Sequence, residues 1–173
     1  MSGAERARPP LRAGRGEGRA LFVAALLLAS GCGYQLATRG APLAGGMGAA
    51  HVAVRPFENH TGDAEAGAFV AAAVREELAR RGGELGAEGR LDGVVEDARA
   101  APSSPNGATW RLGLTVSAKL VDGARTIAEA RVAREEEFLA GQDPLETEGR
   151  RRLALRRAAQ AAARELVERF EAP

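Results

Sequence analysis

The chain has 173 residues, with 24 lysines and arginines against 23 aspartates and glutamates, and it contains one cysteine. A formal charge of +1 lacks the marked basic excess of nucleic-acid-binding proteins, so we expect no nucleic acid as a partner. A single cysteine excludes an intramolecular disulfide, so the folded part must be stabilised by packing alone.

The first 31 residues have the pattern of a secretory signal. Arginines precede the apolar run 21–29, which is too short for a hydrocarbon core that needs roughly 20 residues. Two small residues then lead to Cys32, which is similar to a bacterial lipobox, although Ala29 stands where that motif usually has leucine. We predict that residues 1–31 are removed and that Cys32 is lipidated. The alternative is an ordinary cleaved signal that leaves a free thiol.

The remaining chain divides into a tether and one domain. Residues 32–173 carry 19 basic and 21 acidic residues, which removes the small basic excess of the whole chain. Residues 32–50 are rich in glycine and alanine without an apolar period, so we expect a lipidated N-terminus followed by a flexible tether. Residues 51–173 are long enough for a single domain with its own core.

A strand and a helix are expected at the start of this domain. Residues 51–57 place Val52 and Val54 on one face of a short strand. Residues 58–63 have the composition of a turn and helix cap. From 64 to 81, apolar residues recur at helical spacing until a pair of glycines ends the helix.

The clearest period in the chain follows. Residues 91–96 form a weaker strand pattern, and 101–107 have the composition of a loop. Residues 110–120 alternate strictly between apolar and polar, which indicates a strand buried on one face only. Asp122 and Gly123 turn the chain back into a partner strand with the apolar residues Ala128, Ala130, Val132 and Phe138.

The register of this hairpin depends on the loop length. A two-residue loop made by Asp122 and Gly123 would oppose Ala118 to Ile127 and mix the two faces. A loop one residue longer opposes Ala118 to Ala128 and keeps the apolar residues together. We therefore predict a three-residue loop with a bulge nearby.

A strong helix start follows the partner strand. Asp143, Pro144 and Glu146 occupy the cap, first and third positions of a helix. Its apolar stripe runs to the C-terminus through Leu155, Ala158, Ala159, Ala162, Leu166 and Phe170. The element order is β-α-β-β-β-α. The predicted fold is α+β, with two helices packed on one face of a four-stranded mixed sheet whose other face stays uncovered.

The sequence offers no set of residues spaced for catalysis. Two histidines and one distant cysteine cannot build a zinc site or a Cys/His dyad, so we predict no enzyme activity, metal or cofactor. We interpret His60 as a residue of the capping loop. Residues 135–137 are three glutamates that point to alternate faces of a strand, as on a solvated edge. The arginines within 150–157 either contact an anionic partner or form a solvated helix face, which we favour.

Four segments, 31–36, 52–61, 91–95 and 151–167, carry a resemblance to a known family. The first contains Cys-Gly-Tyr, the second contains Pro-Phe-x-Asn-x-Thr, the third is an Asp-containing apolar strand, and the last is alanine-rich. Together they resemble the LptE family of lipopolysaccharide-assembly lipoproteins. The Cys-Gly-Tyr start combined with the first strand is the specific part.

The resemblance implies an outer-membrane lipoprotein on the periplasmic side. It implies that the protein lies as a plug inside a large β-barrel partner, LptD, and assists delivery of lipopolysaccharide to the cell surface. From the residues themselves, we predict lipopolysaccharide contacts at Lys119 and Arg111 on the open sheet face and at Arg131 on the neighbouring strand. Neighbouring cations suit the phosphates of an anionic glycolipid. Ordinary surface charge is the alternative interpretation.

The first strand also resembles a second class of protein. Its Val-Arg-Pro-Phe-Glu-Asn-His-Thr segment is similar to lipoproteins that reach from the outer membrane and activate peptidoglycan synthases. Such reach favours a long tether, and the tether here is short. An affinity capture distinguishes the two functions, because one predicts a β-barrel and the other a penicillin-binding protein.

Overall fold

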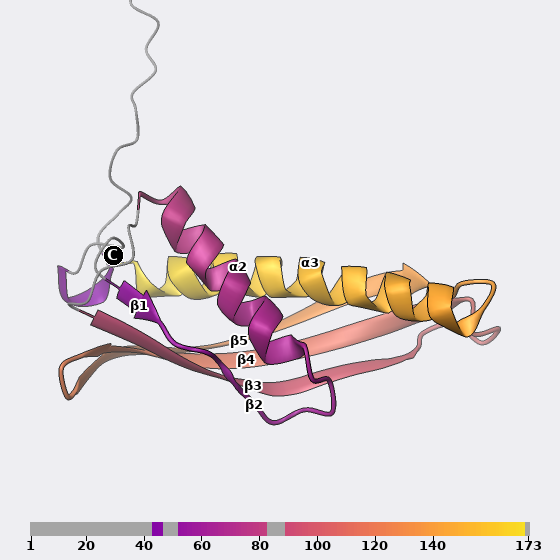
Figure 1. Ribbon diagram of the computed structural model, residues 1–173, viewed down its shortest axis with the longest axis horizontal. Helices are drawn as coiled ribbons and strands as arrows, with labels where there is room; N and C mark the ends of the chain where they lie inside the picture. The colour runs from indigo at the N-terminus through magenta and orange to yellow at the C-terminus, as the bar shows by residue number, and fades with distance from the viewer. Residues whose placement is uncertain (1–42, 47–51, 83–88, 172–173) are drawn as a thin grey trace, which may run out of the picture. The chain divides into compact units, whose positions relative to one another are not determined.

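The computed structural model describes residues 43–46, 52–82 and 89–171 of the chain (Figure 1). All of them belong to one compact unit, Ala37–Pro173. The predicted signal peptide, Cys32 and nearly all of the predicted tether lie outside the described residues. Within the described residues, neither helix contains an apolar stretch long enough to cross a bilayer.

One mixed sheet forms the base of this unit (Figure 1). Two short strands pair in parallel with β3, and the three long strands pair antiparallel in the order β3-β4-β5. The strands are β1 (Val52–Val54), β2 (Glu58–Asn59), β3 (Gly89–Pro102), β4 (Thr109–Asp122) and β5 (Arg125–Leu139).

Both long helices lie on the same face of the sheet, which confirms the predicted α+β architecture (Figure 1). They are α2 (Ala66–Arg80) and α3 (Pro144–Phe170). The start of α3 is as predicted, because the side chain of Asp143 accepts a hydrogen bond from the Glu146 N–H at 2.8 Å. The whole predicted stripe of α3 is buried against the sheet and α2.

Two parts of the sheet differ from the prediction. The segment 58–63 contains the two-residue strand β2, so the sheet has five strands where four were predicted. Strand β3 is also longer than the predicted 91–96 and includes Ala101 and Pro102, which were predicted to be loop. A register shift after Val95 keeps Ala98 and Ala100 on the covered face, so one continuous strand pairs with all of β4.

The predicted hairpin register is wrong by two residues, although the predicted faces are right. Ala118 lies opposite Ala130, not Ala128. The loop has two residues, Gly123 and Ala124, because Asp122 pairs with Arg125, and Gly123 takes a φ of +57°. A bulge between Leu120 and Val121 in the pairing then adds the residue that returns the apolar side chains to one face.

The segment 57–63 joins the sheet to both helices. The ring of Phe57 occupies the space that a Cβ on Gly93 would fill, so glycine is required there for the strand and ring to approach closely. Asn59 accepts hydrogen bonds from the Thr61 N–H at 3.1 Å and the Thr61 hydroxyl at 2.7 Å. Asp63 accepts from the Glu65 N–H at 2.9 Å. The Asn-x-Thr spacing therefore has a structural role in the turn before α2.

Candidate functional site

The uncovered face of the sheet carries the three cations that the sequence singled out. Each lies beside a carboxylate: Arg111 is 3.2 Å from Glu137, Lys119 is 3.0 Å from Glu129, and Arg131 is 2.7 Å from Glu96. The hydrogen bond from Arg131 lowers the pKa of the Glu96 carboxyl below its ordinary value. The open face is therefore a ladder of cross-strand ion pairs between exposed side chains.

The structure brings only two of these cations together. Arg131 lies opposite Ser117, so it is a diagonal neighbour of Lys119. Side chains in that relation have Cα atoms roughly 7–8 Å apart. Arg111 lies eight positions along β4 from Lys119, which is about 26 Å at the rise of a strand. A single phosphate can meet Lys119 and Arg131, whereas a contact at Arg111 requires a larger molecule.

Small residues separate the two groups of charges. Between Arg111 and Lys119, β4 presents Gly113, Thr115 and Ser117 to the open face, all of them half-buried. The middle of this face is thus shallow and polar.

The arginines of α3 form ion pairs within the domain. Arg151 contacts Asp63 and lies 2.8 Å from Glu148. Its hydrogen bonds to Glu148, the larger cause, and to Asp63 raise the pKa of the Arg151 guanidinium. Arg152 contacts Glu65, whose pKa is lowered by that hydrogen bond. These pairs join the first half of α3 to the turn before α2.

The remaining candidate residues are placed as follows. His60 follows β2 in the capping loop, where its N–H donates to the Val95 carbonyl at 3.0 Å. The three glutamates do alternate: Glu137 pairs with Arg111 on the open face, and Glu136 lies 3.2 Å from Arg157 on the covered side. Among the described residues, no group of three His, Cys, Asp or Glu side chains is arranged to hold a metal ion.

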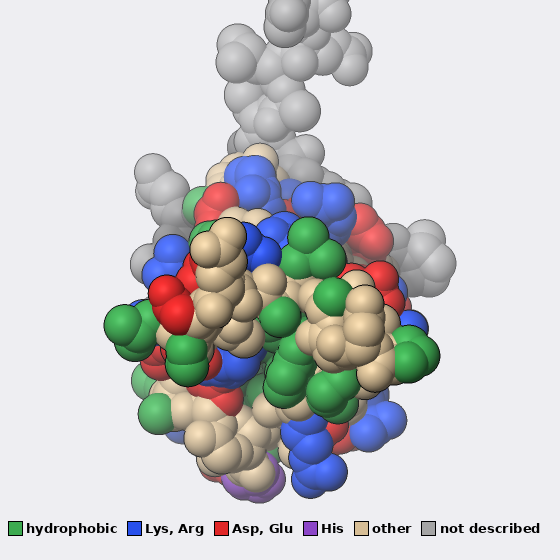
Figure 2. All heavy atoms as spheres, turned by 90° about the vertical axis from the view of Figure 1, so that its right-hand side faces the viewer, with side chains coloured by type: hydrophobic (Ala, Val, Ile, Leu, Met, Phe, Trp, Pro, Cys, Tyr) green, Lys and Arg blue, Asp and Glu red, His purple; other side chains and the backbone are tan. Residues whose placement is uncertain are grey.

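Sequence reasoning missed a hydrophobic end of the domain. Among the described residues, three large hydrophobic side chains are exposed: Leu139 at 60%, Leu145 at 85% and Leu153 at 55%. They belong to the end of β5 and the first three turns of α3, and we call this region the leucine end. Figure 2 views the domain from this side and shows hydrophobic side chains gathered among basic and acidic ones. Leu145 and Leu153 lie off the buried stripe of α3, and this position was the signal in the sequence that could have indicated exposed leucines.

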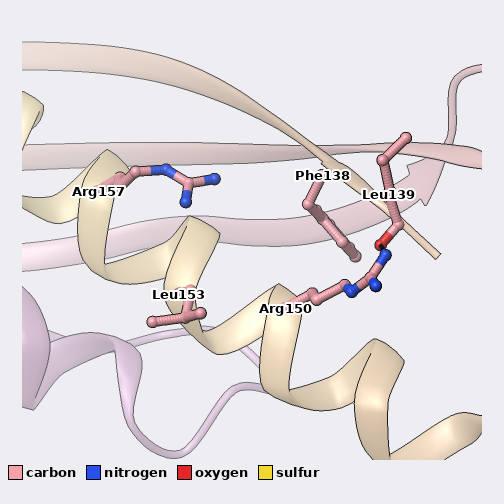
Figure 3. Close-up of a pocket in the computed structure, with 5 residues that line it drawn as sticks. All are labelled: Phe138, Leu139, Arg150, Leu153 and Arg157. Atoms are coloured by element: carbon pink, nitrogen blue, oxygen red, sulfur yellow. Dashed lines mark hydrogen bonds between the residues drawn. The ribbon is translucent and has the colours of Figure 1, made fainter. Parts of the chain in front are cut away.

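A pocket opens at the leucine end, between β5 and α3. Its volume is about 250 Å³, and it is lined by Phe138, Leu139, Arg150, Leu153 and Arg157. In Figure 3, Phe138 points toward α3, while the two arginines reach from α3 toward β5. The pocket thus combines apolar walls with two guanidinium groups.

A family model and several solved structures match the chain. The model described as "LptE: Lipopolysaccharide-assembly" matches residues 49–170. No curated protein matches. A PelC chain from Paraburkholderia phytofirmans, solved as a dodecamer, is 22% identical with a TM-score of 0.53 over 78% of this chain and 94% of that one. A protein described as a lipoprotein, from Caulobacter crescentus, is 20% identical with a TM-score of 0.51 over 64% and 83%.

A third structure, rare lipoprotein B from Shewanella oneidensis, is 14% identical with a TM-score of 0.47 over 65% of this chain and 90% of that one. At such identities, the PelC chain and the Caulobacter protein show a shared fold and nothing about a shared ligand. The family match covers the helix-on-sheet domain from β1 to the end of α3.

Proposed function

Because the chain belongs to the LptE lipopolysaccharide-assembly family, we propose that it plugs and supports a lipopolysaccharide-translocating β-barrel of the LptD kind in the outer membrane. In this proposal, Cys32 carries the lipid that anchors the protein on the periplasmic side. The protein acts by shape and contact and carries out no bond-making chemistry.

The open face of the sheet is the observation that carries the proposal. It is polar, its exposed charges are balanced in pairs, and it has no helix over it (Figure 1). The interior wall of a large membrane β-barrel is itself polar. A polar and nearly neutral sheet face can lie against such a wall without burying unpaired charge or leaving apolar surface in water.

The lengths of the elements also support a plug. Helix α3 has 27 residues, which is about 40 Å at 1.5 Å per residue. Strand β5 has 15 residues, which is about 50 Å. Both exceed the hydrocarbon core of a bilayer, which is about 30 Å thick. A domain built on these elements can extend through the full height of a barrel.

Lipopolysaccharide is the proposed second partner. Lys119 and Arg131 are close enough to share one phosphate, and Arg111 would contact a distant part of the same molecule. The carboxylates beside them would have to exchange partners when an anionic group binds. The proposed contacts therefore predict binding that weakens as salt rises.

Affinity capture from membranes tests the proposal. The full chain, with a C-terminal tag, is expected to be processed at Cys32 and to capture a large outer-membrane β-barrel together with lipopolysaccharide. A matched Cys32→Ser chain should lose membrane retention. Capture of a penicillin-binding protein without a barrel would contradict the proposal and favour an activator of peptidoglycan synthesis.

A further inference from the structure

We propose that the pocket at the leucine end binds an acyl chain of an anionic amphiphile, with Arg150 and Arg157 contacting its charged headgroup. The identification of the natural ligand as lipopolysaccharide rests on the proposed function. The binding of an amphiphile at this pocket does not, and it can be tested separately.

The walls of the pocket suit a single hydrocarbon chain. Phe138 forms the buried floor at 6% exposure, while Leu153 stands at the mouth and is more than half exposed. Leu139 lines the pocket with its backbone carbonyl, and its side chain points away from it (Figure 3). The volume of about 250 Å³ lies just below the range of roughly 300–1,000 Å³ that is typical of drug-sized ligands. One chain, or the end of one, fits this volume, and it would cover apolar surface that now faces water.

Two guanidinium groups stand at the same mouth. Arg150 donates to the carbonyl oxygens of Ala140 at 2.9 Å and Leu139 at 3.4 Å, and it also pairs with Glu146. These contacts hold its guanidinium beside the end of β5, next to the carbonyl oxygen of Leu139 (Figure 3). The N–H of Gln142 and then Arg150 lower the pKa of Glu146, so this carboxylate is charged at neutral pH.

Arg157 approaches the pocket from about two turns further along α3. It lies 3.2 Å from Glu136, donates to the Glu137 carbonyl at 3.4 Å, and is 52% exposed. A guanidinium has five N–H donors, so each arginine keeps donors for another acceptor after these contacts. Phosphate accepts charge-assisted bonds from such donors in a bidentate geometry. The mouth therefore favours an anionic headgroup over a neutral one.

Binding of a ligand in the pocket and insertion of the leucine end into a bilayer would involve different leucines. Leu145 is the most exposed of the three at 85%, yet it does not line the pocket. Insertion of the leucine end into a bilayer would depend on Leu145 at least as much as on Leu153. Binding in the pocket depends on Leu153 and spares Leu145. The same substitution at these two positions thus separates the two modes.

The protein carries its own reporter of the pocket. Trp110 is the only tryptophan of the chain, and its ring centroid lies 6.3 Å from that of Phe138. A chain against Phe138 should change the surroundings of Trp110 and therefore its fluorescence.

The experiment titrates the purified mature protein with dodecyl phosphate below its micelle concentration and follows Trp110 fluorescence. Dodecyl maltoside has the same chain with a neutral headgroup, and inorganic phosphate has the charge without the chain. We expect saturable binding of dodecyl phosphate, binding of the maltoside weaker by about tenfold, and no response to inorganic phosphate, since one lost charged contact is worth about that factor.

Two matched pairs of variants complete the test. Leu153→Gln and Arg157→Gln should each weaken dodecyl phosphate binding by about fivefold or more. Leu145→Gln and Arg164→Gln, on the same helix and exposed but outside the pocket, should leave binding unchanged. All four residues are exposed, so the fold should persist in each variant, and circular dichroism checks this.

Three results would overturn the proposal: Leu153→Gln binding as the wild type does, Leu145→Gln weakening binding as much as Leu153→Gln, or a neutral headgroup binding as tightly as phosphate. The proposed function fails separately. If the wild type captures neither a barrel nor lipopolysaccharide from membranes, that function is contradicted, while the titration still decides the pocket. If Leu153→Gln captures both and binds dodecyl phosphate unchanged, only the pocket is contradicted.

Discussion

The two faces of the sheet can be compared directly at two glycines that lie in neighbouring strands. Gly93 in β3 points to the covered face, and a Cβ there would overlap the ring of Phe57. Gly113 in β4 points to the open face, and a Cβ there would meet nothing within 4 Å. The helices of the domain pack against the covered face, whereas the open face has room for a side chain at Gly113. The same strands therefore carry a packed core on one side and an unfilled surface on the other.

This comparison predicts that substitutions on the covered face cost stability, whereas substitutions on the open face affect binding. The first three predictions below pair a position on the covered side with a matched position that is open or exposed, and the last concerns the open face itself.

The largest expected effect is at Leu114, which is 1% exposed on the covered face. Leu114→Ala should lower the free energy of unfolding by about 2–5 kcal/mol, because it removes buried contacts and leaves a cavity. The neighbouring Thr115→Ala, on the open face, should change it by no more than about 0.5 kcal/mol. Urea denaturation of the two variants measures both. Equal losses of unfolding free energy in the two variants would contradict the difference between the covered and open faces.

The two glycines provide the next test. Gly93→Ala should cost about 1–3 kcal/mol, because the new methyl group overpacks the site of the Phe57 ring. Gly113→Ala should be neutral or stabilise the fold by up to about 1 kcal/mol, since alanine restricts the unfolded strand more than glycine does. Thermal unfolding of both variants compares them. A stabilising Gly93→Ala would contradict the close approach described here.

A buried carboxylate on α2 makes the covered side sensitive to acid. Glu77 is 5% exposed. Burial alone would raise its pKa, but hydrogen bonds from Arg80 and Arg81 outweigh burial and lower the pKa below the ordinary 4.5. The stabilisation is therefore present above pH 4.5 and is lost as the pH falls through the lower pKa of the folded state.

Glu77→Gln should accordingly cost about 1–2 kcal/mol at neutral pH, and its deficit against the wild type should shrink in acid. Glu76→Gln is the control, because Glu76 pairs with the same Arg80 but is 56% exposed. Denaturation across a pH series measures the two curves. A deficit that stays constant down to the acid limb would show that Glu77 does not titrate in this way.

The smallest effect on stability is expected on the open face. Changing Arg111 and Lys119 together to glutamate should alter the free energy of unfolding by at most about 1 kcal/mol, because exposed ion pairs contribute little. The same double variant should weaken lipopolysaccharide binding by about tenfold. Arg164→Glu on α3 is the control for charge alone. Unchanged binding in the double variant would show that Arg111 and Lys119 do not contact lipopolysaccharide.

The parts of the fold that the sequence could predict are those in which one periodicity dominates. The alternation over 110–120 identifies both faces of β4, and the Asp143-Pro144-Glu146 group identifies the first residue of α3. The β4–β5 register could not be predicted, because it combines a two-residue loop with a bulge, and either change alone would reverse the faces. Strand β2 was missed because two residues contain no period.

The candidate site was predictable only in part, for a different reason. The sequence placed Arg111, Lys119 and Arg131 on one face, but it could not show the carboxylate that pairs with each of them, which depends on the register of the strands. The leucine end joins Leu139 of β5 to Leu153 of α3, and only the turn between these elements brings them together. Contacts of this kind are set by tertiary packing, and no local pattern encodes them.

The central claim is that the open face lies against a β-barrel wall, and a cross-link from that face tests it most directly. A photoreactive residue at Ser117, in the middle of the open face, would be introduced into the full chain in its native outer membrane. The account predicts an adduct with a large outer-membrane β-barrel. An adduct with a penicillin-binding protein, or no adduct from Ser117 while the protein is present and processed, would contradict it.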